Sequence, residues 1–223
     1  MHGIFRNPPP CRAVLFDLDG TVLNTNNLII QSFKHVFQKI NGQSISSDEI
    51  IACFGEPLSV SLQRLAPHNW EALLAEYRQY SLLHHDELTE IFPGAEECLK
   101  QLRCVPIKLG IVTSKMRRTA LMGLDLFNLT PFFDGIVGME DCQKHKPDPD
   151  PVIKGCAAVG VSVAEALMVG DSVFDIKSAK AAGVYAVGVK WSMNDSDLLI
   201  EAGADAIVSS FNEVHHLATF NNV

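Results

Sequence analysis

Two pairs of aspartates have a spacing that could support phosphoryl transfer. Asp17 and Asp19 lie two residues apart in the segment Asp-Leu-Asp-Gly-Thr. If extended geometry persists through this segment, both carboxylates project to the same side, and Gly20 then lets the chain turn sharply. Two carboxylates this close in a crevice repel each other unless they share a cation or a proton. The pair predicts either a bound metal ion or one protonated acid, and both suit phosphoryl transfer.

The second pair is Asp171 and Asp175, four residues apart at the expected start of a helix. This spacing places them one turn apart on one face, where like charges are mildly unfavourable without a cation. Helix N-capping alone would explain Asp171 but would not require Asp175. Oxygen ligands with no His or Cys nearby favour magnesium over zinc. We therefore expect Mg²⁺ as the cofactor.

A lysine held on rigid backbone could supply positive charge for a phosphate. Lys146 precedes Pro147, which keeps it out of a helix, and Asp148 can cap the helix expected to begin near Pro149. Lys144, two residues earlier, is the alternative for the same role. Lys146 is preferred of the two.

The candidate residues follow short apolar runs that predict buried parallel strands. Asp17, Thr113 and Asp171 stand at the ends of three such runs, near residues 13–16, 109–112 and 166–169. Further strands are expected near 134–138, 184–189 and 206–208, and helices near 115–127, 151–159, 173–182 and 195–202. This alternation predicts an α/β fold with a doubly wound, Rossmann-like parallel sheet, in which ligands bind at the carboxyl ends of the strands. The three polar strand ends are expected to meet in one crevice.

A helical segment interrupts this alternation. Ile29, Phe33 and Phe37 recur at helical spacing, and no strand is expected between residue 25 and Pro93. The pattern predicts a small inserted helical cap domain over residues 25–88, with helices near 26–40, 47–54, 58–66 and 69–84. The core domain would then consist of residues 11–24 and 89–223. The first ten residues contain three consecutive prolines and are expected to form an exposed lead-in.

Composition limits the classes of partner. The net charge of −8 and pI near 5.4 disfavour nucleic acids and anionic membranes as partners, so a small phosphorylated molecule is expected. The six cysteines include no CxxC pair, and neither a leader peptide nor a long apolar run is apparent. We expect a cytoplasmic protein that is a monomer or a weak homodimer.

These residues together resemble the four motifs of the haloacid dehalogenase superfamily. The matching motifs, in order, are Asp17-x-Asp19-Gly20-Thr21, Thr113, Lys146 and Gly170-Asp171-Ser172-x-x-Asp175. The resemblance spans about residues 12–208. Within the superfamily, the segments from Asn24 to Ile30 and from Gly110 to Leu121 look most like the pyrophosphatases linked to HPr(Ser-P) dephosphorylation, with phosphoglycolate phosphatases as near neighbours.

The resemblance implies a role for each matching residue. Asp17 would attack phosphorus and form an aspartyl phosphate, and Asp19 would act as general acid and then general base. Mg²⁺ would be held by Asp17, the main-chain carbonyl of Asp19 and Asp171, with Asp175 supporting the metal shell. The remaining assignments are the phosphate-binding residues Thr113, Ser114 and Lys146 and a cap loop for substrate at Gly55, Glu56 and Pro57.

The function implied is Mg²⁺-dependent hydrolysis of a small phosphorylated substrate, with pyrophosphate and phosphoglycolate as the first candidates. Two other enzymes stay open, a sugar-phosphate phosphatase and a phosphoglucomutase-like phosphotransferase. A non-catalytic regulator that binds a phosphorylated ligand is a third alternative, but the presence of both Asp17 and Asp19 favours an enzyme.

Overall fold

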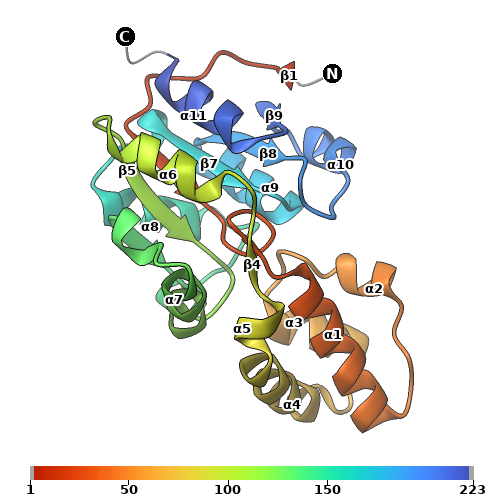
Figure 1. The fold of residues 1–223 in the computed structure, drawn as a ribbon. Coiled ribbons are helices and arrows are strands. Elements are labelled where there is room, and N and C mark those ends of the chain that lie inside the picture. Colours follow the sequence, from red (N-terminus) through yellow and green to blue (C-terminus); the bar gives the residue numbers. More distant parts are fainter. Residues whose placement is uncertain (1–2, 221–223) are drawn as a thin grey trace.

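The computed structural model describes residues 3–220 and contains one large sheet (Figure 1). Its strand order is β1-β9-β8-β7-β2-β5-β6, and every neighbouring pair is parallel except the antiparallel pair β1 and β9. The strands are β1 (Gly3–Ile4), β2 (Ala13–Phe16), β5 (Lys108–Val112), β6 (Gly135–Val137), β7 (Ala166–Gly170), β8 (Tyr185–Val189) and β9 (Ala206–Val208). The parallel α/β sheet predicted from the alternating apolar runs is confirmed.

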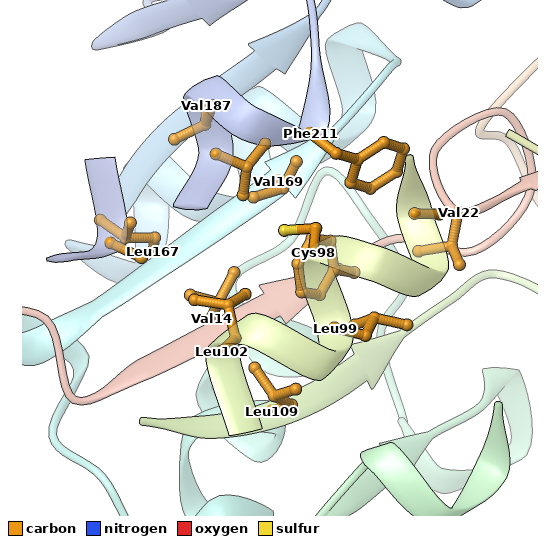
Figure 2. Close-up of a cluster of buried hydrophobic side chains, with 14 of the residues drawn as sticks. Val14, Val22, Cys98, Leu99, Leu102, Leu109, Leu167, Val169, Val187 and Phe211 are labelled. Atoms are coloured by element: carbon orange, nitrogen blue, oxygen red, sulfur yellow. The ribbon is translucent and has the colours of Figure 1, made fainter. Parts of the chain in front are cut away.

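Helices cover both faces of the sheet because successive side chains of each strand point to opposite faces. On β2, Val14 and Phe16 pack into one hydrophobic cluster, whereas Ala13 and Leu15 pack into another. The first cluster, shown in Figure 2, includes residues of α6 (Ala95–Arg103), α7 (Arg117–Leu126) and α11 (Phe211–Thr219). The second includes residues of α8 (Asp150–Val159), α9 (Val173–Ala182) and α10 (Ser196–Glu201).

The inserted segment is helical and has a hydrophobic cluster of its own. Within that cluster, the rings of Phe33 and Tyr77 pack edge to face, with 5.3 Å between the ring centroids. Figure 1 shows these helices beside the carboxyl-end edge of the sheet rather than on one of its faces. They are α1 (Asn26–Val36), continued by a π-helical turn (Phe37–Asn41), α2 (Ser47–Ile51), α3 (Leu58–Leu65), α4 (Trp70–Leu83) and α5 (His85–Leu88).

Two short antiparallel strands connect the insertion to the sheet-containing part. They are β3 (Leu23–Asn24) and β4 (Glu90–Ile91), and Leu23 pairs with Ile91. The predicted domain boundaries at 24/25 and 88/89 fall beside these strands, and the division into domains stays a prediction.

Three expectations about local structure need correction. The lead-in is not wholly exposed, because β1 extends the sheet edge and Pro8 is buried. A strand, β4, does precede Pro93, but two residues are too few to give an alternating pattern. Helices α6 and α11 are not predicted from the sequence, although both bury apolar side chains against the sheet.

Within residues 3–220, no helix is long and apolar enough to cross a bilayer.

Candidate active site

Three neighbouring strand ends bring Asp17, Thr113 and Asp171 to one edge of the sheet. Strand β2 lies between β7 and β5 and is parallel to both. The main chain of Asp17 continues this register, since its N–H donates to the carbonyl of Val169 at 2.8 Å. The three side chains are almost fully buried. The sheet therefore gathers the predicted strand-end residues, as the doubly wound topology requires.

The turn after Asp17 requires glycine because the chain passes close to Asp171. Gly20 has a φ of +84°, which a residue with a side chain rarely adopts. A Cβ built on Gly20 would lie 2.4 Å from a carboxylate oxygen of Asp171. The absence of a side chain here permits the two acidic segments to approach each other.

Lys146 lies at the centre of the acidic residues. Its Nζ is 2.8 Å from Oδ1 of Asp17 and 2.5 Å from Oδ1 of Asp175, and its side chain is 1% exposed. Burial, the largest influence, acts to lower the pKa of Lys146, but the two carboxylates outweigh it and raise that pKa above the usual range. Lys146 is therefore charged. Lys144 instead lies on the surface and pairs with Asp148 at 3.4 Å.

Asp17, Asp171 and Asp175 each place a carboxylate oxygen within 4.8 Å of the other two. Burial raises the pKa of Asp17 well above its usual range, against the opposing charge of Lys146. Burial, followed by the charge of Asp175, raises the pKa of Asp171 to about 7. A cation beside these oxygens would favour their charged forms.

Asp175 already uses both of its oxygens. Oδ1 accepts from Lys146, and Oδ2 accepts from the main-chain N–H and the hydroxyl of Ser172, at 3.0 and 2.6 Å. The Ser172 hydroxyl in return accepts the N–H of Asp175, which completes a capping box at the start of α9. Asp175 thus fixes the junction of β7 and α9 and the position of Lys146.

Asp171 is held from several sides by neutral donors. Its Oδ2 accepts from the hydroxyl of Ser192 at 2.6 Å and from the side-chain amide of Asn194 at 3.1 Å. Thr21 donates to Oδ1 at 3.3 Å. These hydrogen bonds orient the carboxylate toward the edge at which Asp17 lies.

Asp19 lies outside this group of three carboxylates. Its Oδ1 accepts from Nζ of Lys115 and from the hydroxyl of Thr25, each at 2.8 Å. Thr25 immediately precedes α1, the first helix of the insertion. The Asp19 carboxylate is therefore tied both to the loop after β5 and to the start of the helical segment.

The predicted cap loop reaches the strand ends through one of its three residues. The carbonyl of Gly55 accepts a hydrogen bond from the Ser114 hydroxyl at 3.0 Å. Glu56 points back into the insertion, where it accepts from Ser61 and Arg64. Pro57 is buried and immediately precedes α3.

Four contacts of the site involve residues for which no role is predicted from the sequence. Thr25 and Lys115 bind Asp19, while Ser192 and Asn194 bind Asp171. A lysine two residues beyond a polar strand end was a usable signal for Lys115. Ser192 and Asn194 follow β8 in a loop without any recognisable spacing, so only the folded chain places them at Asp171.

The donor set fits a magnesium ion. When all four carboxylates are ionised, Asp17, Asp19, Asp171 and Asp175 exceed the charge of the two ammonium groups, those of Lys115 and Lys146, by two. The acceptors around the three clustered acids are all oxygens, the ligands that Mg²⁺ prefers. A divalent cation would balance the remaining charge.

Known proteins share both the sequence pattern and the fold. The family model of the haloacid dehalogenase-like hydrolases matches residues 14–189. A "Putative pyrophosphatase PpaX" from Caldanaerobacter subterraneus is 47% identical over 196 residues, which cover 88% of this chain and 89% of the relative. The pyrophosphatase PpaX of Halalkalibacterium halodurans is 41% identical over 198 residues, covering 89% of this chain and 92% of the relative.

Solved structures give the same assignment. The crystal structure of a "putative haloacid dehalogenase-like hydrolase" from Bacteroides fragilis superposes with a TM-score of 0.86 at 28% identity. The superposition covers 92% of this chain and 99% of that one. The resemblance to the haloacid dehalogenase superfamily is thereby confirmed: the chain is a phosphohydrolase and belongs to the haloacid dehalogenase-like hydrolase family.

Proposed function

We propose that the protein is a Mg²⁺-dependent phosphatase that hydrolyses pyrophosphate through an aspartyl phosphate on Asp17. The observation that carries the proposal is the buried cluster of Asp17, Asp171 and Asp175, two of which form ion pairs with Lys146. The choice of pyrophosphate rests on the relatives, two of which carry that activity in their names.

Asp17 is the proposed nucleophile because it lies at the middle strand end and is held by a fixed cation. Lys146 binds Oδ1, which orients the carboxylate and lowers the energetic cost of its buried negative charge. Thr113 accepts the main-chain N–H of Lys115 through its own hydroxyl oxygen at 3.2 Å. The hydroxyl proton of Thr113 is thus available to a phosphoryl oxygen, and Ser114 lies next to it.

Asp19 is the proposed acid and base. It would protonate the oxygen that leaves phosphorus, and it would then take a proton from the water that attacks the aspartyl phosphate. Its contacts with Thr25 and Lys115 limit the directions in which the carboxylate can point. Both proton transfers require such a fixed orientation within hydrogen-bonding distance.

Asp17, Asp171 and the main-chain carbonyl of Asp19 are the proposed magnesium ligands, with Asp175 as the residue that supports them. When bound there, the ion would neutralise charge that develops on the transferring phosphoryl oxygens. Ser192 and Asn194 would keep Asp171 directed at the metal position.

The helical insertion over residues 25–88 is proposed to act as a cap that excludes water. Its loop Gly55-Glu56-Pro57 already touches the strand ends through Ser114. Closure over the site would strengthen the electrostatic contacts inside it. A cytoplasmic location and a monomeric or weakly dimeric state remain predictions from the sequence.

The test is Mg²⁺-dependent phosphate release by the wild type and by Asp17→Asn. The panel contains pyrophosphate, phosphoglycolate, sugar phosphates and p-nitrophenyl phosphate. We expect pyrophosphate to give the highest kcat/KM and Asp17→Asn to lower it by on the order of 10³-fold or more. A chelator should abolish wild-type turnover. Full activity in Asp17→Asn would overturn the mechanism, and a better substrate than pyrophosphate would reassign the activity.

A further inference from the structure

The two lysines of the site differ in how many of their N–H groups are in use. A lysine ammonium has three donors and no acceptor. Nζ of Lys146 has three acceptors: Asp17 at 2.8 Å, Asp175 at 2.5 Å and the carbonyl of Val112 at 2.7 Å. Lys146 can therefore bind no further oxygen without giving up one of these contacts.

Lys115 has N–H groups that are not used in hydrogen bonds within the described residues. Its Nζ is 2.8 Å from Oδ1 of Asp19, the one hydrogen bond that this group makes among residues 3–220. Its side chain is 18% exposed, whereas that of Lys146 is 1% exposed, so Lys115 is the lysine of the site that solvent can reach. Two of its three N–H groups are left for an oxygen that enters from solvent.

The position of Lys115 follows from its contacts at the end of β5. Its main-chain N–H donates to the Thr113 hydroxyl, which fixes the loop against the strand end. Its ammonium then donates to Oδ1 of the proposed acid Asp19. An acid that protonates a leaving oxygen must lie about 2.6–3.2 Å from that oxygen. The leaving group therefore departs beside the Lys115 ammonium.

We propose that Lys115 binds the leaving phosphate of pyrophosphate and thereby selects a diphosphate over phosphate monoesters. This inference rests on the function proposed above. In the first step, an oxygen of Asp17 attacks one phosphorus, and the bond from that phosphorus to the bridging oxygen breaks. The bridging oxygen keeps the electron pair, receives the proton of Asp19 and leaves as inorganic phosphate. Hydrolysis of the aspartyl phosphate by one water then gives the second phosphate.

Charge explains why the two substrate classes would differ. The leaving group of pyrophosphate is an anion with several oxygens, and it can accept both spare N–H groups of Lys115. The leaving group of an alkyl monoester is a neutral alcohol once Asp19 has protonated it. Lys115 should therefore favour pyrophosphate in the transition state, and its contribution to the cleavage of a monoester is limited to its hydrogen bond with Asp19.

The test compares Lys115→Gln and Lys115→Arg with the wild type on pyrophosphate, p-nitrophenyl phosphate and an alkyl phosphate, all at saturating Mg²⁺. The side-chain amide of Lys115→Gln can still donate a hydrogen bond to Asp19, but it lacks the charge. For this variant, we expect kcat/KM for pyrophosphate to fall by on the order of 10²-fold and that for the two monoesters to fall by less than about 5-fold. Lys115→Arg should retain most of the preference for pyrophosphate. Lys100→Ala, which removes an exposed lysine paired with Glu96, is the control and should leave all three values unchanged.

An equal fall on all three substrates would mean that Lys115 acts only by positioning Asp19, and it would overturn the inference. If the wild type cleaves pyrophosphate and Lys115→Gln keeps the same preference for pyrophosphate over the monoesters, this inference alone would be overturned. A wild type that cleaves only the monoesters would overturn both this inference and the choice of pyrophosphate.

Discussion

The Gly55 carbonyl in the helical insertion accepts a hydrogen bond from the Ser114 hydroxyl at the end of β5, with 3.0 Å between the oxygens. The approach is possible because Gly55 has no side chain. A Cβ at this position would lie 2.3 Å from Oγ of Ser172, and its φ of +86° is in any case left-handed. The insertion and the strand ends therefore meet where a methyl group cannot fit.

Gly55→Ala is expected to displace the cap loop and to lower kcat/KM by roughly 10²-fold, because misplacement by about 1 Å is enough for such a loss. Gly42→Ala is the matched control. Gly42 also has a positive φ, of +64°, but nothing lies within 4 Å of its added Cβ. This control should cost about 1 kcal/mol of stability and leave activity intact. Equal activity in the two variants, measured as phosphate release, would contradict the role of the Gly55 contact.

Lys146→Ala should damage both stability and activity. It leaves Asp17 and Asp175 buried without their shared cation, and removal of one partner of a buried ion pair costs about 3–5 kcal/mol. Loss of a charge that stabilises the transition state should lower kcat by on the order of 10²–10³-fold. Urea unfolding and phosphate release measure the two effects.

Lys144→Ala serves as its control, since this lysine is 74% exposed and pairs with Asp148 at 3.4 Å. It should change stability by less than about 0.5 kcal/mol and leave kcat unchanged. Equal losses of kcat in Lys144→Ala and Lys146→Ala would show that the buried position of Lys146 is not the cause of the loss.

The sequence predicted the parts of the site that depend on local pattern. Asp17, Thr113 and Asp171 each end an apolar run, and parallel strands necessarily place such residues at one edge. Ser192 and Asn194 could not be predicted, because they reach Asp171 only through the path of the loop after β8. Strand β1 could not be predicted either, because its two residues become a strand only by pairing with β9. The structure brings the named residues together, while their catalytic roles remain proposals.

Asp134 gives a test of stability away from the site. Its carboxylate accepts from Lys108 and Arg103, each at 2.9 Å, and from the main-chain N–H of Leu109. Burial acts first to raise the pKa of Asp134, but these hydrogen bonds and charges outweigh it and lower the pKa. The folded protein therefore binds this proton less tightly than the unfolded chain, so the stabilisation is present above about pH 4 and is lost as the pH falls further.

Asp134→Asn should lower the free energy of unfolding at pH 7 by about 1–2 kcal/mol without changing kcat. The difference from the wild type should shrink below about pH 4. Asp48→Asn, which neutralises an exposed aspartate in the first turn of α2, should cost only a few tenths of a kcal/mol. A constant difference at all pH values, measured by urea unfolding, would show that the charge of Asp134 is not responsible.

Asp171 should make the metal-free protein less stable as the pH rises. Burial, then the charge of Asp175, raises its pKa to about 7. The folded protein therefore holds this proton more tightly than the unfolded chain, and the resulting stabilisation is lost as the pH rises from about 4 to 7.

In the presence of a chelator, the wild type should lose on the order of 1 kcal/mol of unfolding free energy per pH unit in this window, and Asp171→Asn should lose clearly less. Added Mg²⁺ should restore the wild type at pH 7, because an ion that binds only the folded state stabilises it. Identical pH dependence of urea unfolding in the two proteins would show that Asp171 is not the group that titrates.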